Sequence, residues 1–243
     1  MRTIAVIFLF AVVSCMSLQA QMTTIDVNST SGVWSAATST VSGRTISGIG
    51  TSSISWDARS IASIEFGGNS AALSGIGPGT RFLMGSLTIS NWAEPADSTT
   101  NATLDITASL AIPSGGGSVS QTFTYDFSYL EAWSISTDYV CANGGTIYSA
   151  PNTADCADRI RIVNPIASQM LTIGGVDYTL RLGFSADGGT KLLEEFWVVE
   201  TSERKLGLYG EFTATVAPEP GFYGMLGLGL AGGDAAVRRR KAG

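Results

Sequence analysis

The sequence predicts an all-β protein, an antiparallel β-sandwich of jelly-roll type flanked by an N-terminal and a C-terminal targeting segment. Apolar and polar residues alternate along many short segments, which is the period of a strand with one buried face. Turn-forming residues separate these segments, as in Gly-Gly-Asn-Ser at 67–70 and Asp-Gly-Gly at 187–189. The chain shows no strand–helix–strand rhythm, which argues against a parallel α/β fold.

The first 20 residues have the pattern of a secretory signal peptide. Arg2 gives a positive start, residues 4–13 form an unbroken apolar run, and residues 18–20 read Leu-Gln-Ala, which a signal peptidase can recognise. The apolar run is too short to span a bilayer stably. We expect cleavage after residue 20. The alternative is that residues 12–15 act as a lipobox and Cys15 is lipidated; both interpretations place the protein outside the cytoplasm.

Residues 21–216 are expected to form the exported body, whose length suits one domain with a sizeable core. The whole chain has 20 acidic and 14 basic residues, of which two acidic and five basic ones lie in the end segments. The body therefore holds 18 acidic and 9 basic residues and a net charge of −9. Because such a surface repels a phosphate backbone, we do not expect the protein to bind nucleic acid.

About ten short strands are expected in the body, joined by turns of hairpin length. Alternation is plainest at residues 53–56, 81–89, 102–110 and 122–128, and further candidates are residues 159–163, 170–173, 177–184, 195–200 and 208–216. Residues 192–195 give the one hint of a helical turn. Runs of strands without helices predict a single sandwich domain.

Two cysteines remain in the body once Cys15 has been removed. In an oxidising compartment Cys141 and Cys156 have only each other, and they are 15 residues apart. Closing a loop of that length is worth about 3 kcal/mol on the chain-entropy model. Two free thiols or a metal pair are the alternatives, but the chain has no histidine to complete a usual zinc site.

The missing histidine also bears on catalysis. It excludes Ser-His and Cys-His nucleophile pairs and removes the commonest general base near neutral pH. A two-carboxylate glycosidase needs only Asp and Glu, and the candidates would be Asp126, Glu131, Glu194, Glu195 and Glu200. We expect these residues on a solvated sheet face, and so we predict no catalytic residue and no enzyme.

No bound cofactor is expected, with calcium as the alternative. Asp155, Asp158 and Asp187 are hard oxygen donors in segments that read as loops. The chain has no Asp-x-Asp-x-Asp-Gly loop, and solvated turn aspartates would give the same pattern. The sequence therefore gives only weak support for a calcium site.

Five tryptophans could offer an aromatic platform for sugar rings. Trp56 and Trp197 lie inside strand patterns, so we expect them in the core. Trp92 follows Asn91 in a segment that reads as an exposed loop, which makes it the candidate for a surface contact. The alternative is that this loop packs on the edge of the sandwich.

The C-terminal segment, residues 217–243, has three parts. Residues 218–220 read Pro218-Glu219-Pro220, residues 221–237 form an apolar, glycine-rich run, and Arg238, Arg239, Arg240 and Lys241 follow. Seventeen helical residues at about 1.5 Å each reach roughly 26 Å, a little under a hydrocarbon layer of roughly 30 Å. The basic cluster should stay in the cytoplasm and stop transfer. We therefore expect a transmembrane helix with the body facing outward.

This tail resembles the PEP-CTERM sorting signal of exported proteins in Gram-negative bacteria. The resemblance rests on the Pro-Glu-Pro triplet, the Leu-Gly repeat at 226–230 and the terminal arginines. It implies cleavage by a membrane protease of the exosortase type and traffic linked to extracellular polysaccharide. Asp234 departs from the small apolar residues of that pattern, and a carboxylate in a span weakens its insertion. The alternative is an ordinary tail anchor.

The body carries short motifs in a fixed order. They are Gly-Val-Trp-Ser at 32–35, Gly-Ile-Gly at 48–50 followed by Ser-Trp at 55–56, residues 82–88, Cys-Ala-Asp at 156–158, residues 175–184, Glu200, and Leu-Tyr-Gly at 208–210. This order resembles the choice-of-anchor K domain, which overlaps a group named for a Thr-His-x-Asn motif. Thr88 and Asn91 stand in place, while Ile89 replaces the histidine. The resemblance implies an exported domain and no established activity.

These observations predict an exported protein that is first anchored at the inner membrane, then released to the cell surface or extracellular matrix. The leading hypothesis is a structural or interaction protein of that matrix, linked to exopolysaccharide. The alternative hypothesis is a carbohydrate-binding module that uses Trp92.

Overall fold

A computed structural model describes residues 24–215 of the chain, apart from residues 43, 57–61, 93–97, 114–116, 132–139, 142, 154 and 174–175. The predicted signal peptide, the Pro-Glu-Pro triplet, the C-terminal span and its basic end lie outside the described residues, as does Trp133. In the described part of the chain, no helix is long and apolar enough to cross a membrane.

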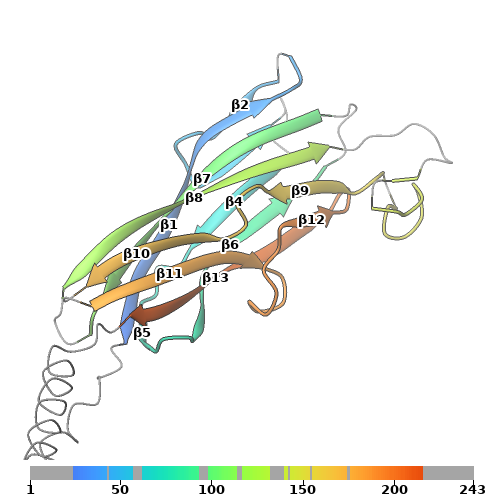
Figure 1. Cartoon of the computed structure of the whole chain (residues 1–243). Helices are drawn as coiled ribbons and strands as arrows, with labels where there is room; N and C mark the ends of the chain where they lie inside the picture. Colours follow the sequence, from blue (N-terminus) through green and yellow to red (C-terminus); the bar gives the residue numbers. More distant parts are fainter. Residues whose placement is uncertain are drawn as a thin grey trace, which may run out of the picture.

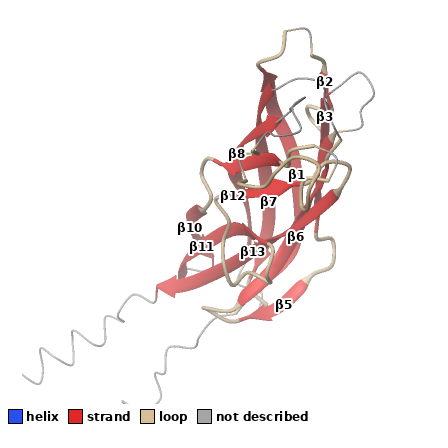
Figure 2. Ribbon diagram, turned by 90° about the vertical axis from the view of Figure 1, so that its right-hand side faces the viewer, coloured by secondary structure: helices blue, strands red, loops and turns tan. Residues whose placement is uncertain are grey.

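Within the described residues the chain forms thirteen strands and no helix, which confirms the prediction of an all-β fold (Figure 2). The strands are β1 (Ile25–Ser39), β2 (Ile46–Ser47), β3 (Ser53–Trp56), β4 (Ser63–Gly68), β5 (Leu73–Ile76), β6 (Arg81–Ser90), β7 (Ser98–Ala111), β8 (Ser118–Glu131), β9 (Asp158–Ile162), β10 (Ala167–Ile173), β11 (Val176–Ser185), β12 (Glu195–Val198) and β13 (Glu203–Thr215). The hint of a helical turn at 192–195 was wrong, because the chain there runs straight into β12.

The strands form two curled antiparallel sheets (Figure 1). Sheet A has six strands in the order β12-β9-β8-β7-β1-β5, and sheet B has seven in the order β10-β11-β13-β6-β4-β3-β2. The chain crosses between the sheets several times, so that strands adjacent in sequence often lie in different sheets. Both sheets contribute to one hydrophobic core, as a sandwich requires.

The longest strand, β1, was not predicted. Its pairing with β7 shifts register between Val27 and Ser29 and again between Trp34 and Ala36. Each such irregularity moves the following residues to the other face, so the strand loses the strict alternation that sequence analysis relies on. On its inner face, Thr30 and Gly32 also stand where larger apolar residues would be expected.

Aromatic side chains join the two sheets across the core. On β8, Tyr125 and Phe127 point inward, and the ring of Phe184 on β11 meets them edge-on at centroid distances of 5.2 and 5.7 Å. Trp34 of β1 lies 5.5 Å from Phe127 on the same sheet. All four side chains are fully buried. Edge-to-face pairs of this kind stabilise a core beyond the area that they bury.

A close contact also links β1 of sheet A to β4 of sheet B. The Thr30 amide donates to the Asn69 carbonyl at 2.9 Å, and the Asn69 amide donates to the Thr30 hydroxyl at 2.8 Å. Gly68 makes this approach feasible, because a Cβ atom there would lie 2.0 Å from the Thr30 carbonyl oxygen. The two sheets are therefore joined by hydrogen bonds along one side as well as by packing in the core.

Candidate functional site

Strand pairing brings several strand ends together at one end of the sandwich. In the β8–β9 ladder Leu130 lies opposite Arg159, and in the β9–β12 ladder Val198 lies opposite Asp158. The ends of β8 and β12 therefore meet the start of β9. Residues just beyond these ends come from distant parts of the sequence, and they form a polar cluster inside the sandwich.

Three buried carboxylates lie at the centre of this cluster. Glu131 is the last residue of β8, Asp158 the first of β9, and Glu200 follows β12. Their side chains are 1%, 0% and 2% exposed, and one oxygen of each lies within 4.8 Å of the others. We call Glu131, Asp158 and Glu200 the carboxylate cluster. Burying three such groups so close together costs free energy unless polar partners compensate.

Two further buried side chains connect the carboxylate cluster to the core. The Tyr129 hydroxyl is hydrogen-bonded to Asp158 Oδ2 and lies 2.7 Å from Asn91 Oδ1. The Asn91 amide donates to the Val198 carbonyl at 3.0 Å and to Glu200 Oε1 at 3.4 Å. These bonds tie the end of β6 to β8, β9 and the segment after β12. Together they act as a polar anchor for four separate segments.

Burial and charge both act on Tyr129. Removal from water raises the pKa of its phenol well above the ordinary value, and the nearby negative charges of Asp158 and Glu131 raise it further. Tyr129 therefore keeps its proton and remains a hydrogen-bond donor. Its ring also packs on Trp56 at a centroid distance of 4.6 Å.

Basic and neutral donors lie near the cluster as well. Arg44 donates to the Ser98 hydroxyl at 2.8 Å, and Ser98 lies opposite Glu131 in the β7–β8 ladder. Arg44 and each of the three carboxylates also take part in further non-covalent interactions. The carboxylate cluster is thus part of a connected network.

Oxygen atoms with this spacing could also coordinate a divalent cation such as calcium, which takes six to eight oxygen ligands. Of the three aspartates that the sequence suggested for calcium, only Asp158 lies here. It is buried on a strand, so its expected place in a solvated loop was wrong.

The other two aspartates, Asp155 and Asp187, make hydrogen bonds within their own local segments. Asp155 is buried, and its Oδ1 accepts a hydrogen bond from the Cys156 amide at 2.7 Å. Asp187 Oδ1 accepts from the Ser185 hydroxyl at 2.6 Å and from the Lys191 amide at 3.0 Å. The Ser185 bond, followed by the Lys191 bond, lowers the pKa of Asp187 below its ordinary value. The structure does not gather the three aspartates into one ligand set.

The acidic residues considered for glycosidase chemistry divide into two groups. Asp126, Glu194 and Glu195 are exposed, as expected of a solvated face. Glu131 and Glu200 are buried in the carboxylate cluster, which corrects the expectation that they would be solvated. A polymer chain cannot reach carboxylates that are at most 2% exposed.

The disulfide between Cys141 and Cys156 is present and confirms the predicted pairing, with an S–S distance of 2.01 Å and a Cα–Cα distance of 5.3 Å. Both cysteines and Ile147 form a small core of their own. Within the loop, Asn143 donates to Asn152 Oδ1 at 2.8 Å, and Asn152 donates back at 3.1 Å. The disulfide ends two residues before Asp158, so it fixes the entry of the chain into the cluster.

Several short sequence motifs meet at this end of the sandwich. Trp56, Asn91, Asp158 and Glu200 lie far apart in sequence, yet all are buried in or against the network. Ile89, which stands where the Thr-His-x-Asn group has histidine, points inward two residues before Asn91 and is fully buried. Position 89 is therefore a core position in this chain.

Sequence reasoning missed Tyr129 as a member of the network. A signal for it existed, because Tyr125, Phe127, Tyr129 and Glu131 follow one another with period two. A carboxylate at the next inward position of an aromatic strand face is an indication of a buried polar site.

The tryptophans behave only partly as expected. Trp56 is fully buried, but Trp197 is half-buried and alternates with the buried Phe196 and Val198, so the core prediction was wrong for it. Trp92 is 46% exposed, which fits a residue in an exposed loop.

Comparison with protein-family models finds the PEP-CTERM protein-sorting motif at residues 216–241. Comparison with curated proteins finds no match. The motif indicates an exported protein whose membrane-anchored precursor is processed by an exosortase, a membrane protein.

The Tyr129 hydroxyl gives a first prediction. Tyr129→Phe should lower the free energy of unfolding by about 1–3 kcal/mol, because Asp158 and Asn91 lose a buried hydrogen-bond partner. Urea unfolding followed by tryptophan fluorescence measures this. Tyr178→Phe is the matched control, since the buried Tyr178 hydroxyl has no hydrogen-bond partner among the described residues and its removal should be close to neutral.

The same variant should change the response to alkali. The unfolded chain releases the tyrosine proton at a pH of about 10, while the raised pKa keeps it bound in the folded state. Stability from Tyr129 is therefore complete below about pH 10 and is lost as the pH rises above it. The decline between pH 9 and pH 11 should be shallower in Tyr129→Phe. Equal slopes in both proteins would contradict the assigned role.

The disulfide gives a second prediction. Replacing both Cys141 and Cys156 with Ser should lower the free energy of unfolding by about 3 kcal/mol, because the unfolded chain regains the entropy of a 15-residue loop. Urea unfolding under oxidising conditions measures the loss. A reductant should destabilise the wild type by a similar amount and leave the double variant unchanged. Equal midpoints of all four samples would show that the disulfide contributes nothing.

Proposed function

We propose that the mature protein is a non-enzymatic structural or interaction component of the cell surface or extracellular matrix, associated with exopolysaccharide. The observation that carries this proposal is the sorting motif at residues 216–241, which marks a protein for export and for processing by an exosortase. The mature chain would begin near residue 21 and end near Pro218. Its role would then depend on the sandwich alone.

Two features support a role without catalysis. The chain has no histidine, so the commonest general base is missing. Among the described residues, three carboxylates whose oxygens lie within 4.8 Å of one another are buried and engaged in a network that anchors strand ends. A stable, negatively charged sandwich with a disulfide suits a protein that must persist outside the cell.

We further propose that the body is a choice-of-anchor K domain with a jelly-roll type of sandwich. Support for this comes from the meeting of Trp56, Asn91, Asp158 and Glu200, which belong to the motifs of that resemblance, in one buried network. The motifs that this chain shares with that domain would then serve to anchor strand ends and would not form an active site.

The sorting proposal predicts a defined change in mass and location. In its native host the protein should be found outside the inner membrane with a mass that matches residue 21 to a residue near Pro218. In a strain without the exosortase it should remain at the inner membrane and keep Arg238 to Lys241. Cell fractionation with intact-mass measurement tests both. A mature chain that keeps the basic end in both strains would show that the tail is a plain anchor.

A second candidate function is carbohydrate binding through Trp92. The observation that favours it is the 46% exposure of this side chain directly after Asn91, whose buried amide is held by two hydrogen bonds. A rigidly anchored neighbour reduces the entropy lost when an aromatic side chain contacts a ligand. Exposed aromatic rings offer flat apolar faces against which sugar rings can pack.

Affinity electrophoresis tests the second candidate. The host polysaccharide, cast into a native gel, should retard the wild type, and Trp92→Ala should run at the mobility seen without polysaccharide. Tyr148→Ala is a matched control, because it removes another aromatic side chain that is 56% exposed. Equal retardation of the wild type and Trp92→Ala would rule out a role for Trp92.

A further inference from the structure

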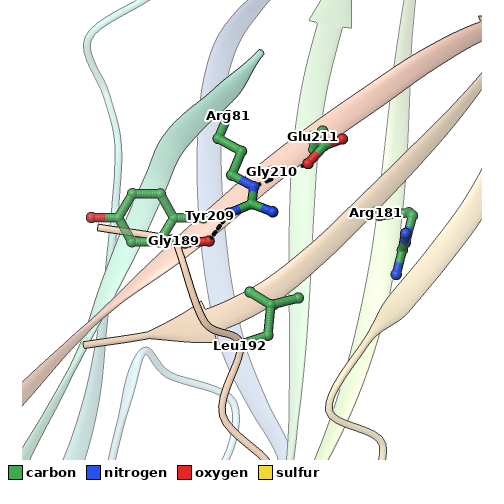
Figure 3. Close-up of a pocket in the computed structure, with 8 residues that line it drawn as sticks. Arg81, Arg181, Gly189, Leu192, Tyr209, Gly210 and Glu211 are labelled. Carbon is green, nitrogen blue, oxygen red and sulfur yellow. Dashed lines mark hydrogen bonds and ion pairs between the residues drawn. The ribbon is translucent and has the colours of Figure 1, made fainter. Parts of the chain in front are cut away.

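The outer face of sheet B carries a small hollow between β6, β11 and β13 (Figure 3). Its volume is about 70 Å³, enough for several water molecules or one small charged group. We call it the arginine hollow. Its lining includes Arg81, Arg181, Gly183, Leu192, Tyr209 and Glu211.

Three charged side chains cross the arginine hollow in a row. Arg181 of β11 lies opposite Glu211 of β13, and Glu211 lies opposite Arg81 of β6. Arg81 Nε is 3.1 Å from Glu211 Oε2, and Arg81 Nη1 donates to the carbonyls of Gly189 and Thr190. Arg81 is therefore occupied by protein acceptors, and Glu211 neutralises one of the two positive charges.

Arg181 differs from Arg81 in its surroundings. It makes no hydrogen bond or ion pair with any residue of the described part of the chain, and its side chain is exposed. Taken together, the side chains of Arg181, Glu211 and Arg81 have a net charge of one positive unit. A guanidinium with free donors beside a hollow can bind an oxyanion through two parallel hydrogen bonds.

The walls of the arginine hollow are held in place. Leu192 packs over Gly183, where a Cβ atom would lie 2.8 Å from Leu192 Cδ1. The Tyr209 ring packs against Gly189, whose φ of +89° suits glycine and where a Cβ atom would lie 2.9 Å from the ring. The loop between β11 and β12 is further fixed by the hydrogen bonds of Asp187. A ligand would therefore meet a preformed surface.

We propose that the arginine hollow binds the carboxylate of a uronic acid residue in an acidic polysaccharide. Arg181 holds the carboxylate, while Tyr209 and Leu192 contact the apolar face of the sugar ring. The inference rests on the proposed association with exopolysaccharide, but it uses a site separate from Trp92. Although the body carries a net charge of −9, charges more than about 8 Å away are largely screened at physiological salt.

Isothermal titration of the protein isolated from its host tests the assignment. The probe is a trimer of galacturonic acid, with neutral galactose trimer and sulfated galactose trimer as comparisons. We expect wild type to bind the uronate trimer at least tenfold more tightly than the neutral trimer, and Arg181→Gln to lose this difference. Arg181→Lys should lose most of it, because lysine keeps the charge without the planar fork.

Arg161→Gln is the matched control, since it removes an exposed arginine from β9 of the other sheet. Its affinity for the uronate trimer should stay within twofold of wild type. Equal binding by wild type and Arg181→Gln, equal binding of the acidic and neutral trimers, or no binding of the uronate trimer would each overturn the proposal. Tighter binding of the sulfated trimer, lost in Arg181→Gln, would replace uronate with a sulfate ester.

The proposed export to the cell surface and the proposed uronate site are tested by different measurements. Fractionation and intact mass decide whether the protein reaches the cell surface, whatever Arg181 binds. Titration with the three trimers decides the role of Arg181, wherever the protein is located.

Discussion

The inward face of β8 supports most of this structure. Its alternation turns Tyr125, Phe127 and Tyr129 toward the core, where they meet aromatic rings of both sheets. The next inward position is Glu131. The same alternation that places aromatic rings in the core therefore also places the Glu131 side chain in the carboxylate cluster. Core packing and the polar network at the end of the sandwich thus depend on one strand register. A slip of one residue would expose all of these side chains.

Burying three carboxylates at the end of a sandwich is costly, and the surrounding contacts explain how the fold tolerates it. Tyr129 and Asn91 donate hydrogen bonds to two of them, and the disulfide fixes the chain just before Asp158. Half-satisfied networks destabilise a fold, whereas connected ones define a single arrangement of the segments that they join. The network therefore specifies how strand ends and loops meet.

The inner and outer faces of the sheets present different kinds of side chain. Inward side chains form the core and the carboxylate cluster, which solvent and polymers cannot reach. The outer face of sheet B instead presents charged and aromatic side chains around a hollow, and Trp92 is exposed beyond the end of β6. A protein built this way keeps its stability independent of the side chains that it presents to solvent. Surface residues can then change with little effect on the fold.

The sequence alone determined the strand period of most of the body, the cysteine pair and the sorting tail, because each depends on residues that are close in sequence or unique in the chain. It did not reveal β1, whose bulges break the alternation. From the sequence, Glu131, Asp158 and Glu200 were expected to be exposed to solvent, because charged side chains usually lie on the surface. Only the tertiary structure decided that these three meet, because strand pairing brings together residues up to 69 positions apart.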